Sequence, residues 1–82
     1  MRKHRVSLEE ARTAFSDDNA PLMADPDRSD DEERFVLLGL SARLRALVVC
    51  HCYRQHGTAI RIISARRADP LERATYDERW RR

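Results

Sequence analysis

The sequence contains no long hydrophobic run, so it offers no helix that could span a membrane. Such a helix needs roughly 20 consecutive apolar residues, and no stretch of the 82-residue chain approaches that length. The basic start, residues 1–5, is also not followed by the hydrophobic segment of a secretory signal. These absences predict a cytoplasmic protein.

Cysteine is scarce, and Cys50 and Cys52 lie too close in one predicted strand to bridge each other. A chain without stapling disulfides is typical of the reducing cytosol. The run Cys50-His51-Cys52 also makes a poor zinc site, because alternate side chains of a strand point to opposite faces and no second ligand pair follows at finger-like spacing. We therefore expect no metal and no cofactor.

Glycine and proline are few, with 2 and 3 residues, while 41% of the chain is hydrophobic and 37% is charged. This composition is typical of a small folded protein rather than of a disordered one. At this length folding buries only about 60–65% of the surface that the unfolded chain exposes. We expect one domain over residues 1–82, without linkers or repeats.

Charge is unevenly distributed along the chain, although the net charge is only +2. Residues 1–53 carry 8 Lys/Arg against 10 Asp/Glu, whereas residues 54–82 carry 8 against 4. The two parts are therefore expected to bind different partners. The acidic run 25–33 lacks the glycine that a calcium-binding loop needs, so we interpret it as a solvated loop or as a docking strip for a basic partner.

The hydrophobic pattern predicts an α+β fold with a meander of antiparallel strands. Ser7 and Glu10 form a capping box at the start of a helix that ends near Ser16. Short turns between the strand-like runs favour antiparallel pairing, and Asp69-Pro70 is a typical helix start. After the first helix we expect a short edge strand over 21–24, strands over 34–40, 45–53 and 58–65, and a helix over 71–82.

Arginines near the end of the last predicted strand could bind phosphate. Arg61 lies on a sheet face, and Arg66 and Arg67 follow just beyond the strand. Guanidinium groups bind phosphate with two parallel hydrogen bonds and stay charged. Strict alternation places Ile60, Ile62 and Ser64 on one face and Arg61, Ile63 and Ala65 on the other. The alternative is ordinary surface arginines, or pairing with the acidic loop.

His51 and Tyr53 share a face near the end of the preceding strand. Beside arginines, an imidazole and a phenol could act as general acid or base in RNA cleavage, and that reaction needs no metal. The alternative is a half-buried histidine beside an interface tyrosine. Tyr76 and Trp80 lie on one side of the last helix, where core packing is the favoured interpretation.

These segments together resemble the BrnT toxin family over nearly the whole chain. The run 60–66, IRIISAR, followed by Ala68, Glu72-Arg73 and Tyr76, is the most specific part. The other matching segments are Lys3-His4 with residues 6–11 (VSLEEA), residues 25–29 (DPDRS) followed by residues 32–35 (EERF), Gly39-Leu40-Ser41, and residues 48–54 (VVCHCYR).

The resemblance implies a RelE-like fold, with about four antiparallel strands flanked by helices, and an endoribonuclease that arrests bacterial growth. It also implies a type II toxin–antitoxin system, in which a ribbon-helix-helix antitoxin of the BrnA kind neutralises the toxin in a hetero-oligomer and binds operator DNA. Candidate catalytic residues are Arg61, Arg66 and Tyr76, followed by His4 and Glu10 as candidate bases. Candidate RNA-binding residues are Arg67, His51, Tyr53 and Arg54.

The chain departs from the family pattern near its start and in the acidic loop. It begins inside the family's first helix, so we expect an open sheet edge that invites pairing with another chain. Arg5 replaces a glycine of the pattern, and Arg28 replaces a histidine. A second hypothesis is therefore a catalytically impaired homologue that binds the antitoxin as a co-repressor. A stand-alone nucleic-acid-binding domain ranks last, because a single-strand platform would need interleaved surface aromatics.

Overall fold

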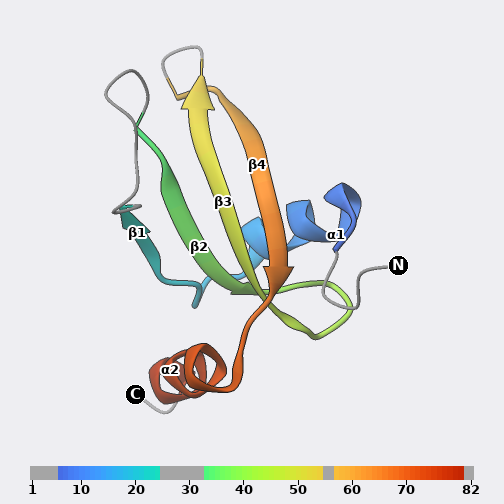
Figure 1. Ribbon diagram of the computed structural model, residues 1–82, viewed down its shortest axis with the longest axis vertical. Helices are drawn as coiled ribbons and strands as arrows, with labels where there is room; N and C mark the ends of the chain where they lie inside the picture. The colour runs from blue at the N-terminus through green and yellow to red at the C-terminus, as the bar shows by residue number, and fades with distance from the viewer. Residues whose placement is uncertain (1–5, 25–32, 55–56, 81–82) are drawn as a thin grey trace.

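The structure is a computed structural model that describes residues 6–24, 33–54 and 57–80 (Figure 1). His4, most of the acidic run, residues 81–82 and the side chain of Trp80 lie outside the described residues. The elements are α1 (Leu8–Thr13), the 3-10 turn η1 (Ala14–Ser16), β1 (Leu22–Ala24), β2 (Phe35–Leu40), β3 (Ala46–Arg54), β4 (Ala59–Arg67) and α2 (Pro70–Trp80).

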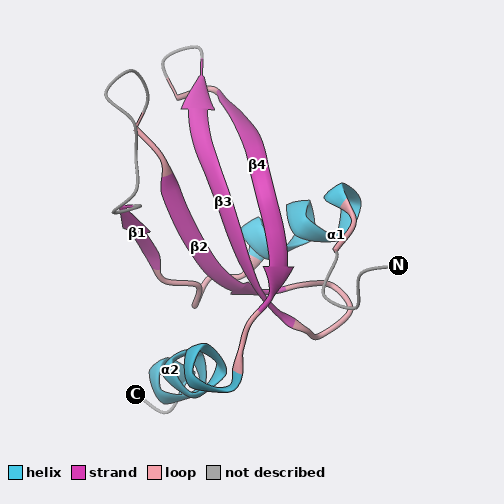
Figure 2. Ribbon diagram, in the orientation of Figure 1, coloured by secondary structure: helices cyan, strands magenta, loops and turns pink. Residues whose placement is uncertain are grey.

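All four strands join one antiparallel sheet in the order β1-β2-β3-β4. The predicted α+β fold, four antiparallel strands with a helix at each end of the chain, is therefore confirmed (Figure 2). Helix α1 covers one side of the sheet, which we call the α1 side, and we call the opposite side the far side. Helix α2 lies beyond the end of the sheet where β4 finishes (Figure 1). No helix within the described ranges is long and apolar enough to cross a membrane.

The first helix begins where its capping residue predicts. The Ser7 hydroxyl accepts a hydrogen bond from the Glu10 amide at 3.1 Å. The second half of the expected capping box is replaced, because the Glu10 carboxylate bonds Ser41 and Arg45. Those contacts tie α1 to the turn between β2 and β3, about thirty residues further along the chain.

The hydrophobic core lies between α1 and the sheet. Ala11 and Ala14 are fully buried against Leu37, Leu47 and Val49 from β2 and β3. Small helix residues allow a close approach: a Cβ added at Gly39 would lie 2.9 Å from the Ala14 carbonyl oxygen. The glycine in β2 is therefore needed for the packing of η1 on the sheet.

Strand β4 contains a bulge that the strict alternation predicted from sequence misses. Cys50 pairs with Ser64 and His51 pairs with Ile62, so Ile63 is the extra residue. The predicted faces are wrong beyond this point: Ser64 joins the side of Arg61, and Ala65 joins the side of Ile62. A period of two holds only while each residue of one strand opposes one residue of its partner.

Helix α2 starts with the predicted cap. Asp69 Oδ1 accepts a hydrogen bond from the Glu72 amide at 2.8 Å, and Glu72 Oε1 accepts one from the Asp69 amide at 2.9 Å. These reciprocal bonds form a capping box, with Pro70 at the first helical position. The start of α2 is thus fixed immediately after β4.

Candidate functional site

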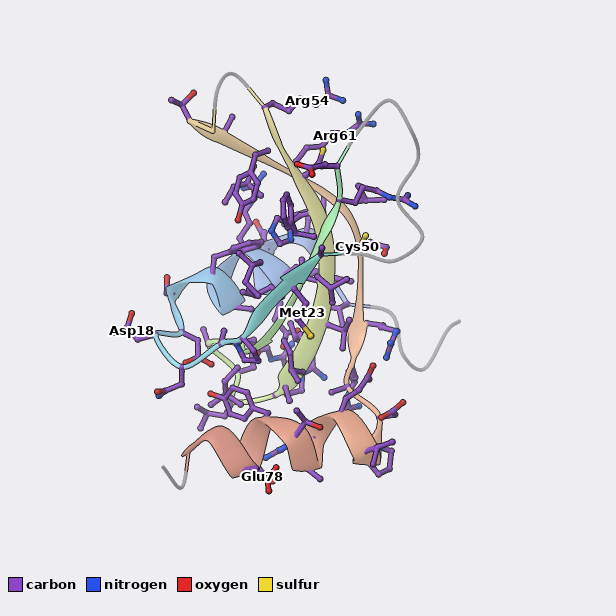
Figure 3. The ribbon with its side chains drawn as sticks, turned by 90° about the vertical axis from the view of Figure 1, so that its left-hand side faces the viewer. Asp18, Met23, Cys50, Arg54, Arg61 and Glu78 are labelled. Carbon is purple, nitrogen blue, oxygen red and sulfur yellow. The ribbon has the colours of Figure 1, made fainter. Side chains whose placement is uncertain are left out.

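Arginines gather on the far side of the sheet. Antiparallel partners share a face, and Arg61 lies opposite Cys52, Arg66 opposite Val48 and Arg54 opposite Ala59. All three belong to the side away from α1, and Figure 3 shows Arg54 and Arg61 near the end of the sheet remote from α2. We call Arg54, Arg61 and Arg66 the far-side arginines.

The bulge at Ile63 brings Arg61 and Arg66 to one face. Arg66 is the fifth residue after Arg61, and in an unbroken strand two residues an odd number of positions apart lie on opposite faces. Their partners Cys52 and Val48 are four positions apart on β3, which is about 13 Å along the strand. Two extended arginine side chains can span this distance to reach a phosphate that lies between them.

Arg66 is held by a carboxylate from α2. Its Nη1 and Nη2 atoms donate to Glu72 Oε1 and Oε2, both at 2.8 Å. This pairing raises the pKa of Arg66 and lowers the pKa of Glu72. The Arg66 side chain keeps 50% of its surface exposed, so a phosphate in solution can reach it.

Arg61 also borders a hollow at the outer edge of the sheet. This hollow has a volume of about 500 Å³ and lies between α1 and β4. Its lining is mostly apolar and consists of Leu8, Arg12, Phe15, Ile60, Arg61 and Ile62. Among the described residues β4 pairs only with β3, so its other edge carries no strand.

The candidates His51 and Tyr53 lie on the α1 side, opposite Ile62 and Ile60. The His51 ring is fully buried, and Phe15 packs edge-on against it at 4.8 Å between ring centroids. Nδ1 lies 3.2 Å from the Val49 carbonyl oxygen, which can only accept a hydrogen bond, so this nitrogen carries the proton. Nε2 then accepts from the Tyr53 hydroxyl at 3.3 Å.

Burial lowers the pKa of His51, although its backbone contact works in the other direction. At neutral pH the ring is therefore uncharged. The ring is more deeply buried than the half-buried histidine of the alternative interpretation, and its surface is not exposed to RNA. Arg67, opposite Leu47, also belongs to the α1 side.

Glu10 is buried in an ion pair beneath the turn between β2 and β3. Its carboxylate accepts from Arg45 Nε at 2.9 Å and from the Ser41 hydroxyl at 2.7 Å, and Arg45 Nη2 completes the pair. The bonds from Arg45 outweigh the effect of burial and, with Ser41, lower the pKa of Glu10 to about 2. A carboxylate with this pKa is a weak proton acceptor at neutral pH.

Tyr76 is buried, with only 2% of its surface exposed, as the interpretation of a core aromatic predicts. Its hydroxyl donates to Asp17 Oδ2 at 2.5 Å, and the same oxygen accepts from the Leu40 amide at 2.8 Å. Burial disfavours the charged Asp17, but the bonds from Tyr76, Leu40 and Asn19 prevail and lower its pKa. The contact joins α2 to the segment after η1 and to the end of β2.

The structure therefore divides the predicted site residues among three places. Arg54, Arg61 and Arg66 share the far side; His51, Tyr53 and Arg67 belong to the α1 side; Glu10 and Tyr76 occupy buried polar contacts. Sequence reasoning missed Arg45 and Asp17, whose roles depend on contacts between distant segments. Glu72 carried a usable signal, since it stands three residues after Asp69 in a capping box.

A model of the family described as "Ribonuclease toxin, BrnT, of type II toxin-antitoxin system" matches residues 1–72. The chain belongs to the BrnT family. Membership implies ribonuclease activity and an antitoxin partner. A search of curated proteins returned no match.

For a BrnT ribonuclease, a surface that binds the charged backbone of RNA is required. The far side of the sheet presents several arginines, whereas the α1 side is mostly occupied by the core. Within residues 6–24, 33–54 and 57–80, no group of three or more His, Cys, Asp and Glu side chains is placed to hold a metal ion.

Proposed function

We propose that this protein is a cytoplasmic, metal-independent endoribonuclease that arrests growth and binds its RNA on the far side of the sheet. The observation that carries the proposal is the bulge at Ile63, which turns Arg61 and Arg66 to the same face. Bulges often redirect a side chain next to a functional site. A ribonuclease family and a face rich in arginine together favour RNA over other anionic ligands.

In the proposed reaction the ribose 2′-oxygen attacks the adjacent phosphorus while a base removes the 2′-proton. The bond from phosphorus to the 5′-oxygen breaks, and that oxygen takes a proton from a general acid. The products are a 2′,3′-cyclic phosphate and a free 5′-hydroxyl. Arg61 and Arg66 bind phosphate oxygens and stabilise the negative charge that accumulates in the transition state.

Proton transfer needs a base that is not already engaged in a structural contact. Glu10 would have to leave Arg45 and Ser41 to act as base, and Tyr76 would have to leave Asp17. We therefore assign the base to His4, because an unperturbed histidine side chain suits proton transfer near neutrality. In this assignment Tyr76 anchors α2, and His51 with Tyr53 supports the packing of α1.

We further propose a ribbon-helix-helix antitoxin of the BrnA kind as the partner. In this scheme the hetero-oligomer represses its own operator through the antitoxin, and the toxin itself makes no contact with DNA. A basic RNA-binding face attracts an acidic protein segment by the same charges that attract phosphate.

A second candidate function is that of a catalytically impaired co-repressor module. It is favoured by the same two buried contacts, because they engage both Glu10 and Tyr76 while the far-side arginines remain in place. Phosphate contacts alone provide affinity without cleavage. In this case the protein binds antitoxin and RNA but does not cut.

The test is cleavage of a mixed-sequence RNA by the purified protein in the presence of EDTA. Arg61→Ala and Arg66→Ala are expected to lower the cleavage rate by about 10²-fold or more each, since each removes a charged donor from the transition state. Arg73→Ala is the matched control, because Arg73 is an exposed arginine of α2 paired with Asp77.

Cleavage by the wild type with EDTA and loss in both far-side variants would support the proposal. Full activity in Arg61→Ala and Arg66→Ala would move the site elsewhere. Binding of antitoxin without any RNA cleavage by folded wild-type protein would favour the co-repressor. Cleavage that disappears with EDTA would contradict metal independence.

A further inference from the structure

We infer that Glu72 is a positioning residue that holds Arg66 with one edge of its guanidinium turned out to receive an RNA phosphate. The inference rests on the proposed function and adds a residue that acts through Arg66 rather than on RNA itself. It depends on which atoms of the guanidinium are used and which remain available.

Glu72 uses the end of the guanidinium rather than its side. Nη1 and Nη2 each donate one N–H to the carboxylate, at 2.8 Å. The second Nη1 hydrogen has an acceptor in the Arg67 carbonyl oxygen, 3.3 Å away. An arginine has five N–H donors, so Nε and the outer hydrogen of Nη2 remain. These two donors point the same way and match two oxygens of a phosphate.

A second arginine of this chain shows the blocked arrangement. Arg45 donates to Glu10 through Nε and Nη2, which is the same pair of donors that Arg66 keeps available. The Arg45 carboxylate partner is buried, with 5% of its side chain exposed, whereas that of Arg66 is 30% exposed. Arg45 thus has both of these donors occupied by Glu10, whereas Arg66 keeps Nε and one Nη2 hydrogen available for a phosphate on the far side.

Glu72 is itself fixed by the start of α2. Its Oε1 accepts from the Asp69 amide at 2.9 Å, and its own amide donates to Asp69. The helix start therefore sets the position of the carboxylate, and the carboxylate sets the orientation of Arg66. Ordering a long side chain before the ligand arrives reduces the entropy lost on binding and keeps the donors aligned for reaction.

The experiment compares Glu72→Gln with Asp77→Asn in the RNA cleavage assay. Glutamine keeps the capping box but loses the negative charge and one of the two acceptor oxygens that bind Arg66. Asp77→Asn makes the same change in net charge on the same helix, in an exposed pair with Arg73. We expect Glu72→Gln to lower kcat by about tenfold with KM unchanged or lower, because the donors are misaligned in the transition state. Asp77→Asn should leave kcat unchanged.

A double variant separates positioning from stability. In an Arg66→Ala background, Glu72→Gln should cause no further loss of kcat, because there is no guanidinium left to orient. A further loss would mean that Glu72 acts through α2, and the inference would fail. A kcat for Glu72→Gln equal to that of Asp77→Asn, or an increase that reveals a masked arginine, would also overturn it.

The failure of the proposed function has a different signature. If Arg66→Ala cleaves like the wild type, Arg66 is not part of the site, whatever Glu72→Gln does. If the folded wild type binds RNA without cutting it, the variants are compared by the slope of log affinity against log salt concentration instead of by kcat. Losing one phosphate contact on a single strand lowers that slope by about 0.7. The inference then requires a lower slope for Glu72→Gln and fails if the slope equals that of Asp77→Asn.

Discussion

The Glu10 carboxylate, a candidate base, is engaged by contacts that its local sequence does not predict. The sequence shows a glutamate in the first turn of a helix, where a capping box is the local expectation. Nothing local in that pattern predicts Arg45 or Ser41, which lie more than thirty residues away. Ala11 and Ala14 pack α1 closely against the sheet. This packing places Glu10 beside the turn after β2, where it pairs with Arg45.

The Glu10 ion pair predicts a specific dependence of stability on pH. The folded pKa is about 2, below the ordinary 4.5, so the pair stabilises the folded state fully above the unfolded pKa. This contribution is lost as pH falls from about 5 toward 2. Glu10→Gln should lower the free energy of unfolding by about 1–2 kcal/mol at pH 7, because the bonds to Arg45 lose their charge.

Urea denaturation of the wild type and of Glu10→Gln at pH 7 and at pH 3 measures this effect. The difference between the two proteins should shrink at the lower pH, where the wild-type carboxylate takes up a proton in the unfolded state. Glu9→Gln is the control, since Glu9 is the exposed neighbour in the same helical turn. An equal difference at both pH values would show that the pair does not hold this charge.

At the scale of elements, sequence reasoning located each helix and strand found in the described residues, including the short strand before the acidic run. Periodicity and turn residues are local signals, and they set the ends of β2, β3 and α2 to within a few residues. The bulge in β4 has no such signal in the sequence, because isoleucine at position 63 is equally common in a regular strand. One unpaired residue then exchanged the faces of Ser64 and Ala65, and with them the side on which Arg66 lies.

The hydrogen bond from Tyr76 to Asp17 helps to attach helix α2 to the rest of the protein. Tyr76→Phe keeps the ring but removes the hydroxyl that donates to Asp17. We expect the free energy of unfolding to fall by about 1–2 kcal/mol, since the partly buried Asp17 carboxylate loses a donor. Amide hydrogen exchange in α2 should accelerate more than exchange in β3.

Tyr53→Phe provides the control for the helix attachment. It removes the other tyrosine hydroxyl of the chain, whose contact with His51 is longer, at 3.3 Å, and lies on the α1 side. Exchange in α2 should stay at the wild-type rate in this variant. If both variants accelerate exchange in α2 equally, the Asp17 contact is not what holds the helix.

At the scale of the whole molecule, the resemblance supplied the family, and the sheet decides which of its arginines share a face. The basic character of residues 54–82 was visible from composition, but composition assigns no charge to a side of a sheet. Arg66 and Arg67 are neighbours in sequence and lie on opposite sides. The proposal that RNA binds the far side is therefore more specific than a proposal that it binds the basic half of the chain.

The salt dependence of RNA binding distinguishes the two sides of the sheet. Each phosphate contact on a single strand contributes about 0.7 to the slope of log affinity against log salt. Arg54→Ala and Arg61→Ala should each reduce that slope by about this amount, because both residues lie on the far side. Arg67→Ala removes the same charge from the α1 side and should leave the slope nearly unchanged. Equal reductions in all three variants would show that RNA is attracted by net charge alone, and a loss confined to Arg67→Ala would place the RNA on the α1 side.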